Sequence, residues 1–93
     1  MTVHDLKSWP HFFRALQGGY KPFEVRRNDR DYKTGDYLRL REWDPLSERF
    51  TGQELVVRVV TVYDLTPIGC PGYVAMALRP DSEVVRELWR TVL

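Results

Sequence analysis

The long apolar run within residues 50–63 restricts the fold more than any other segment. Its centre, LVVRVVTVY, is rich in β-branched residues. Because Val, Thr and Tyr are weak helix formers and no capping residue precedes the run, it predicts a strand rather than a helix. Both faces of such a strand are apolar except at Arg58 and Thr61. We therefore expect this strand to be buried on both sides or to form part of a barrel wall.

Four shorter segments also predict strands: residues 3–7, 23–26, 36–43 and 72–79. In two of them apolar and charged residues alternate, as in a half-buried strand: Phe23 and Val25 in one, Leu38 and Leu40 in the other. Residues typical of turns separate consecutive segments. Strands joined by short turns imply a mostly antiparallel, curled sheet or small barrel.

Two helices are expected beside this sheet. Ser8 is a candidate N-cap for a helix near residues 9–17, with Pro10 in its first turn and Gly18–Gly19 ending it. A second helix is predicted near residues 82–91, where apolar residues recur at helical spacing. The fold class is therefore α+β, with element order β-α-β-β-β-β-α.

The composition indicates one globular domain spanning residues 1–93. Aromatic residues make up 13% of the chain and the net charge is only +1, which excludes a disordered chain. The single cysteine, Cys70, excludes a disulfide framework. No apolar run reaches the roughly 18 residues of a membrane span, and the start does not resemble a signal peptide. We expect a soluble, cytoplasmic domain with no membrane association.

Positive charge is concentrated in one part of the chain. Residues 21–41 contain seven basic and four acidic residues, so this segment is +3 and the remainder is −2. The isoelectric point of about 7.9 lies below that of a strongly basic nucleic-acid-binding protein. Any anion-binding site is therefore expected to be a local patch.

A strand within this basic segment carries the candidate site. If Phe23 and Val25 face the core, Glu24 and Arg26 project together from the opposite face. One interpretation is an exposed lattice of salt bridges with the arginines at 39 and 41, which would contribute little stability. The other is a pocket in which the guanidinium binds phosphate or a base edge, and the carboxylate accepts from an exocyclic amine or acts as an acid or base. The candidate ligand-binding residues are Lys7, Lys21, Glu24, Arg26, Arg27, Asn28 and Arg30.

Other kinds of chemistry find little support. His4, His11 and Cys70 lack the spacing of metal ligands, so we expect no metal and no cofactor. Cys70 has no neighbouring cation that would make it a reactive thiolate. The phosphate-binding patterns GxxxxGK[ST] and GxGxxG are absent from the sequence.

Two motifs, KPFEVRRNDR at residues 21–30 and TGDYLRLRE at residues 34–42, carry a family resemblance together with the opening HDLKSWPHFF. The chain resembles small ASCH-type domains of the PUA-like superfamily from about residue 4 to residue 78. The resemblance implies a curled, barrel-like sheet with one helix bordering a cleft. It also implies that Lys21, Glu24 and Arg26 line this cleft, in a superfamily associated with RNA and modified nucleobases.

One ASCH-type relative is a small amidohydrolase that deacetylates acetylated cytidine. Its pattern is similar to K-x-x-T-x-R, and this chain keeps Lys21 and Arg26 but has Glu24 in place of the catalytic threonine. The enzyme also needs a later acidic residue, for which Asp64 is the nearest candidate. Lys21 and Glu24 are therefore the candidate catalytic residues.

Three functions follow as hypotheses. The leading one is a binding module for RNA, single-stranded nucleic acid or a nucleotide. The first alternative is a small amidohydrolase acting on a modified nucleoside. The second is a protein-interaction module, which would show an exposed apolar patch around Trp43 or Trp89.

Overall fold

The computed structural model describes residues 2–19 and 21–79. The helix predicted near residues 82–91, with Trp89, lies outside these residues. Within them the elements are β1 (Val3–Ser8), α1 (Pro10–Gln17), β2 (Phe23–Arg27), β3 (Tyr37–Asp44), β4 (Arg49–Asp64), the short 3₁₀ helix η1 (Thr66–Ile68) and β5 (Tyr73–Arg79). The prediction of five strands and an early helix is confirmed.

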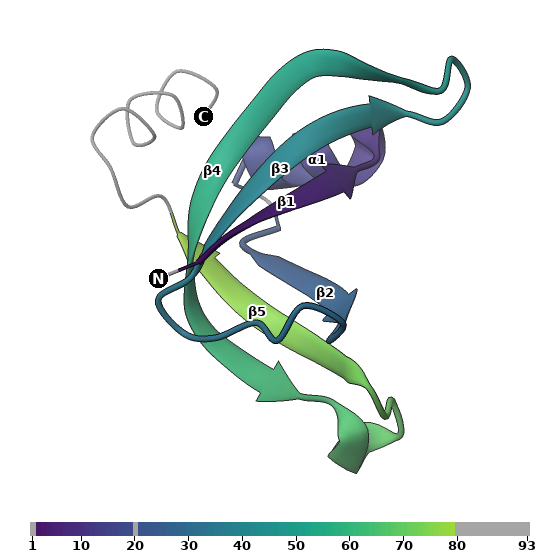
Figure 1. Ribbon diagram of the computed structural model, residues 1–93. Helices are drawn as coiled ribbons and strands as arrows, with labels where there is room; N and C mark the ends of the chain where they lie inside the picture. The colour runs from purple at the N-terminus through teal and green to yellow at the C-terminus, as the bar shows by residue number, and fades with distance from the viewer. Residues whose placement is uncertain (1, 20, 80–93) are drawn as a thin grey trace.

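The five strands form one sheet in the order β1-β3-β4-β5-β2. Strand β1 is parallel to β3, and the other neighbouring pairs are antiparallel. Figure 1 shows that the sheet curls into a half-barrel whose open side lies between its edge strands, β1 and β2. The expectation of a curled, mostly antiparallel sheet is therefore confirmed.

Strand β4 produces much of this curl. Its first half pairs with β3 and its second half with β5, and the register shifts between Val59 and Thr61. Such a bulge bends a strand and increases its twist. One face of β4 is buried, at Leu55, Val57 and Val59, whereas Val60 is 40% exposed. The prediction that this strand is buried on both sides is wrong, because no second layer among the described residues covers its outer face. The alternative prediction, a strand in a curved wall, is observed.

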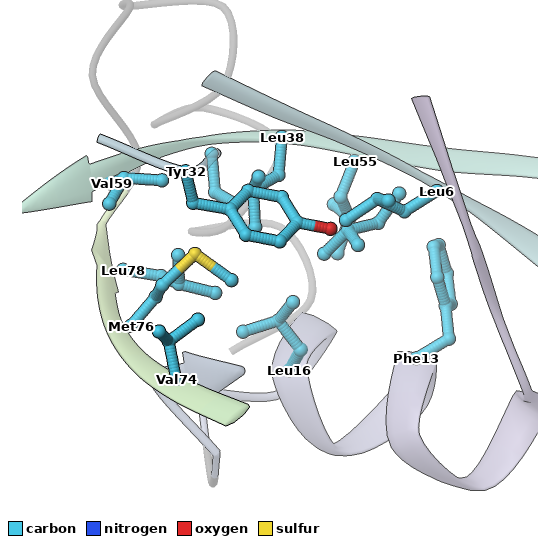
Figure 2. Close-up of a cluster of buried hydrophobic side chains, with 12 residues drawn as sticks. Leu6, Phe13, Leu16, Tyr32, Leu38, Leu55, Val59, Val74, Met76 and Leu78 are labelled. Carbon is cyan, nitrogen blue, oxygen red and sulfur yellow. The ribbon is translucent and has the colours of Figure 1, made fainter. Parts of the chain in front are cut away.

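The core fills the concave side of the half-barrel (Figure 2). Helix α1 packs there and contributes Phe13 and Leu16, each 1% exposed. Its partners come from four strands and from the loop after β2: Leu6, Tyr32, Leu38, Leu40, Leu55, Val57, Val59, Val74, Met76 and Leu78. The helix is thereby fixed against the sheet next to the open side. No helix in the described part of the chain has the length and apolar character needed to cross a membrane.

The junction between β1 and α1 is a single residue, Trp9, which occupies the N-cap position in extended conformation without a side-chain cap. Ser8 was therefore wrongly predicted as the cap: it is the last residue of β1 and is buried. Pro10 begins the helix as predicted, because its missing N–H has no partner to lose there. Beyond the helix, Gly19 adopts a positive φ of 79°, which glycine tolerates without strain. This direct strand-to-helix connection leaves Trp9 56% exposed at the open side.

Candidate functional site

The two edge strands approach each other at the open side of the half-barrel through arginine side chains. Arg26, on β2, donates from Nη2 to the backbone carbonyl of Lys7 at 2.7 Å. Arg30, in the loop after β2, donates from Nη1 to the carbonyl of Asp5 at 3.1 Å. Both carbonyls belong to β1, which is an edge strand of the sheet formed by the described residues. The sequence-predicted Arg26 and Arg30 are therefore brought to the strand that carries Lys7, across 19 residues of chain to Lys7 and 25 to Asp5.

Strand β2 buries the face that the sequence analysis expected to be exposed. Glu24 is 5% exposed, whereas Phe23 and Val25 are 47% and 49% exposed. The alternation is correct, and Glu24 shares a face with the half-buried Arg26 as predicted, but the placement of Phe23 and Val25 in the core is wrong. The inner face of this edge strand lies at the open side of the half-barrel, where a carboxylate can be buried if cations pair with it.

Two cations pair with Glu24. Lys21 Nζ donates to Oε1 at 2.7 Å, and Arg26 Nε donates to Oε2 at 2.8 Å, with Nη2 of the same guanidinium 2.6 Å from Oε2 in an ion pair. The side chains of Lys21 and Arg26 are only 17% and 26% exposed. The predicted triad therefore forms a compact, largely desolvated cluster. The expected lattice with Arg39 does not form, because Arg39 pairs with Asp5 and Glu54 on the outer face of the sheet.

A cavity of about 540 Å³ opens onto this cluster. We call it the aromatic cavity, because exposed aromatic residues from the β1–α1 junction, from α1 and from β2 form much of its wall. The helix does border the cleft, as expected. The lining residues are Lys7, Ser8, Trp9, Phe12, Lys21, Phe23, Glu24, Val25 and Arg26.

A second cavity of about 490 Å³, the basic cavity, shares Lys7 and Arg26 with the first. It contains five basic residues and two acidic ones, so its local charge is positive although the whole chain is nearly neutral. The two cavities therefore adjoin each other at the open side, and we refer to them together as the cleft. The lining residues of the basic cavity are Asp5, Leu6, Lys7, Arg26, Arg27, Asp29, Arg30, Tyr32, Arg41 and Phe50.

Besides Arg30, which bonds a backbone carbonyl, three cations of the basic cavity form no ion pair with a carboxylate among the described residues. Lys7 Nζ lies 3.9 Å from the ring centre of Trp43, and the Arg41 guanidinium lies 3.9 Å from that of Phe50. The pKa of Arg27 is raised, chiefly by a hydrogen bond with Tyr73. The rings and the phenol hold these cations without neutralising them, and Asp29 adds a weaker attraction that also raises the pKa of Arg27. They are therefore available to an anion.

Hydrogen bonds within the loop after β2 position its residues at the basic cavity. Asn28 Oδ1 accepts from the backbone N–H of Tyr32 at 3.2 Å. Asn28 lines neither cavity, so the structure places this predicted ligand-binding residue in the loop's own turn. Burial raises the pKa of Tyr32, against the opposing effect of Arg26 and Arg30. Its hydroxyl therefore stays protonated at neutral pH.

A buried pair, His4 and Asp36, anchors the other end of this loop. His4 Nε2 lies 2.8 Å from Asp36 Oδ2, and the backbone N–H groups of Thr2 and Lys33 donate to the same carboxylate. Burial raises the pKa of Asp36, but these hydrogen bonds outweigh it and leave the pKa lowered. The His4 ring also packs edge-on against Tyr32 at 4.8 Å. The loop is thus tied to β1 by a charged group inside the protein.

Of the residues expected of an amidohydrolase, Lys21 and Glu24 meet at the cluster, but Asp64 lies away from it. Asp64 lies at the end of β4, where it accepts from the backbone N–H of Thr66 at 2.9 Å and from its hydroxyl at 2.7 Å. These bonds lower the pKa of Asp64, and it lines neither cavity of the cleft. Glu24 is the acidic residue at the cluster, and both its oxygens already accept from cations.

The lining residues that sequence reasoning missed include Trp9, Phe12 and Arg41. Trp9 and Phe12 could have been found from the helical pattern. When Phe13 and Leu16 of α1 face the core, Trp9 and Phe12 lie outside it. Arg41 had no such signal, since its contribution depends on how far the sheet curls.

Comparisons with known proteins match most of the described chain. Residues 3–78 match the family described as "Domain of unknown function (DUF3850)". The chain is also similar to the "Uncharacterized 12.9 kDa protein in GpA 3'region" of Escherichia phage P2, with 36% identity over 64 residues. That match covers 69% of this chain and 57% of the phage protein, so the chain spans little more than half of that relative. Because the family match includes every described strand but the last residue of β5, this protein belongs to the DUF3850 domain family.

Proposed function

We propose that the cleft formed by the basic and aromatic cavities binds RNA, single-stranded nucleic acid or a nucleotide. The observation that carries this proposal is a set of three cations that form no ion pair within residues 2–19 and 21–79, Lys7, Arg27 and Arg41, on the cavity adjoining a group of exposed aromatic rings. Phosphate binds preferentially to such cations, and bases stack on such rings. A cytoplasmic, PUA-like module of the ASCH type, as the motifs suggest, is part of this proposal.

The two cavities suit the two parts of a nucleotide. Arg27 and Arg41 can donate to phosphate oxygens in the basic cavity, where the guanidinium plane favours bidentate contacts. Trp9, Phe12 and Phe23 present exposed ring surface in the aromatic cavity. A base paired in a duplex could not enter such a cavity, so an unpaired base is the better ligand.

The alternatives have weaker support. Hydrolysis would require a second acid that Asp64 does not supply at this cleft. A protein-interaction surface around Trp43 is disfavoured, since Lys7 lies over that ring and Phe50 packs edge-on against it at 4.9 Å.

Binding can be tested with fluorescently labelled single-stranded RNA and DNA oligonucleotides in anisotropy titrations at several salt concentrations. We expect binding at low salt that weakens as salt rises, with a log–log slope near −2 if about three phosphates are contacted. Arg27→Ala and Arg41→Ala should each reduce that slope by about 0.7. Lys33→Ala is the matched control, because its side chain is 70% exposed and lines neither cavity. Absence of binding at low salt, or equal effects of all three substitutions, would refute the proposal.

A further inference from the structure

Two cations of the basic cavity occupy directly opposed positions on neighbouring strands. Lys7 on β1 is the register partner of Arg41 on β3, so their side chains leave the same face of the sheet. Neighbouring strands are only about 4.8 Å apart, and like charges at this spacing repel each other. Two residues earlier on the same strands, Asp5 is the register partner of Arg39 and forms an ion pair with it at 3.3 Å. The sheet therefore balances charge at one position and leaves it unbalanced at the next.

The carboxylate closest to this pair in register is used elsewhere. Glu54 on β4 is the register partner of Arg41, but both its oxygens accept from Arg39, at 3.3 Å and 2.9 Å. Lys7 Nζ and the Arg41 guanidinium instead lie 5.9 Å and 3.9 Å from the ring centre of Phe50. Both charges thus stay beside one aromatic ring, which attracts cations without removing their charge. An anion bound at this pair would relieve the repulsion.

A third cation reaches the same stretch of β1 from the loop after β2. Arg30 donates from Nη1 to the backbone carbonyl of Asp5 at 3.1 Å, and this partner is neutral. Arg26 donates to the carbonyl of Lys7, but its charge is met by Glu24. The charge of Arg30 therefore adds to that of the opposed pair in the basic cavity.

The charges that remain in the basic cavity are strongly unequal. Its Arg26 and Asp5 already form ion pairs with residues outside the cavity. Within the described part of the chain, the one carboxylate of the cavity that remains is Asp29, which attracts Arg27. The cations that remain are Lys7, Arg27, Arg30 and Arg41. A single negative charge on a ligand leaves most of this excess unbalanced.

Phosphate groups of nucleic acids differ in charge according to their position. A phosphodiester inside a strand carries one negative charge. A phosphomonoester at the end of a strand, or in a mononucleotide, carries about −1.5 to −2 at pH 7 and has three oxygens that accept hydrogen bonds. The monoester therefore matches both the excess of charge and the excess of N–H donors in the basic cavity. We infer that this cavity selects a phosphomonoester over the phosphodiesters within a strand.

This inference rests on the proposed nucleic-acid or nucleotide binding, because it assigns specificity to the same cleft. The two cavities share Lys7 and Arg26, so a phosphate in the basic cavity lies next to a base in the aromatic cavity. A terminal nucleotide can place both groups at once, whether it ends a strand or is free. The phosphomonoester is common to these two sources, and the experiment separates them.

The test compares terminal phosphates that differ in charge. Single-stranded oligonucleotides with a 5′-phosphate, with the methyl ester of that phosphate or with a 5′-hydroxyl are titrated in anisotropy measurements at one salt concentration. The methyl ester keeps the phosphate but has one charge, and a 5′-hydroxyl strand two residues longer controls for total charge. We expect the 5′-phosphate strand to bind the unaltered protein about tenfold more tightly than either control, because its charge is concentrated at the cations. The same series with a 3′-phosphate shows which end is bound, and competition by AMP and by its methyl ester shows whether a free nucleotide suffices.

Variants of the protein connect this preference with the cations. In Arg41→Ala the opposed pair is removed, and the affinity ratio of the phosphomonoester strand to its methyl ester should fall several-fold. In Asp29→Asn the remaining carboxylate is neutralised, so the same ratio should rise. Lys33→Ala is the control, since its side chain is 70% exposed and lines neither cavity, and it should keep the ratio. Because the methyl-ester comparison uses the unaltered protein, it stands even where a variant is unstable.

The possible results separate this inference from the function on which it rests. Equal binding of the phosphorylated strands, their methyl esters and the longer hydroxyl strand overturns the inference but leaves the proposed function standing. Unchanged ratios in both Arg41→Ala and Asp29→Asn also overturn it. Absence of binding by every ligand overturns both the inference and the proposed function.

Discussion

Substitution of Glu24 by Gln tests whether the cluster at the cleft is desolvated. Glu24 keeps 6% of its side-chain exposure and has three N–O contacts of 2.6–2.8 Å with Lys21 and Arg26. Removal of the negative charge leaves two cations close together. Removal of one partner from a fully buried ion pair costs about 3–5 kcal/mol. The side chains of the two cations are 17% and 26% exposed, so water screens part of the repulsion between them. We therefore expect the substitution to lower the free energy of unfolding by about 1–3 kcal/mol.

The assay is urea denaturation followed by tryptophan fluorescence, with Glu54→Gln as the matched control. Glu54 also pairs with an arginine at 2.9 Å, but its side chain is 44% exposed, so its substitution should barely change the free energy of unfolding. Added phosphate should recover part of the loss in Glu24→Gln beyond the general stabilisation seen in the control, because the anion binds next to the unpaired cations. Equal destabilisation by the two substitutions, with no specific effect of phosphate, would show that the Glu24 cluster is a solvated surface network.

Two further predictions concern the groups that hold the cleft in place. The lowered pKa of Asp36 means that its ionised form stabilises the folded state above about pH 4, and that this stabilisation is lost as the pH falls through the folded-state pKa. Asp36→Asn should therefore unfold at neutral pH with a free energy about 1–2 kcal/mol lower than that of the parent protein. Urea midpoints measured at decreasing pH should show this difference narrowing in acid. A gap that stays constant down to about pH 3 would contradict this assignment. Phe13→Ala should cost about 3–5 kcal/mol, because the ring is 1% exposed between α1 and the sheet, whereas Phe12→Ala, at a 51% exposed ring, should stay within about 0.5 kcal/mol in thermal denaturation. Similar melting temperatures for the two variants would show that α1 does not depend on this contact.

Local pattern determined most of the elements of this protein. The β-branched run at β4 and the alternation at β2 and β3 predicted strands in the right places, because these preferences act between near neighbours in the chain. Pro10 likewise marked the start of α1. Ser8 failed as a cap because it pairs with Glu42 in the sheet, and this pairing depends on a residue that is distant in sequence.

The orientation of β2 was decided only by the tertiary structure. Alternation shows which residues share a face, but it does not show which face is covered. In a curled sheet the answer depends on strand order, and β2 pairs with β5, more than forty residues later in the chain, at an edge of the sheet. Burial of Glu24 became possible because Lys21 and Arg26 neutralise it there, while Phe23 and Val25 remain exposed.

The positions of the site residues also depend partly on local sequence and partly on the tertiary structure. The spacing of Glu24 and Arg26 was sufficient to predict that they share a face, since residues two apart in a strand project from the same side, whereas Lys21 was grouped with them through the family resemblance. The cleft itself required the curl, which brings the carbonyl of Lys7 to Arg26 across the open side. Local sequence determines which side chains a strand offers, and the long-range pairing of strands determines which of them meet, because that pairing alone sets the distance between the two edges of the sheet.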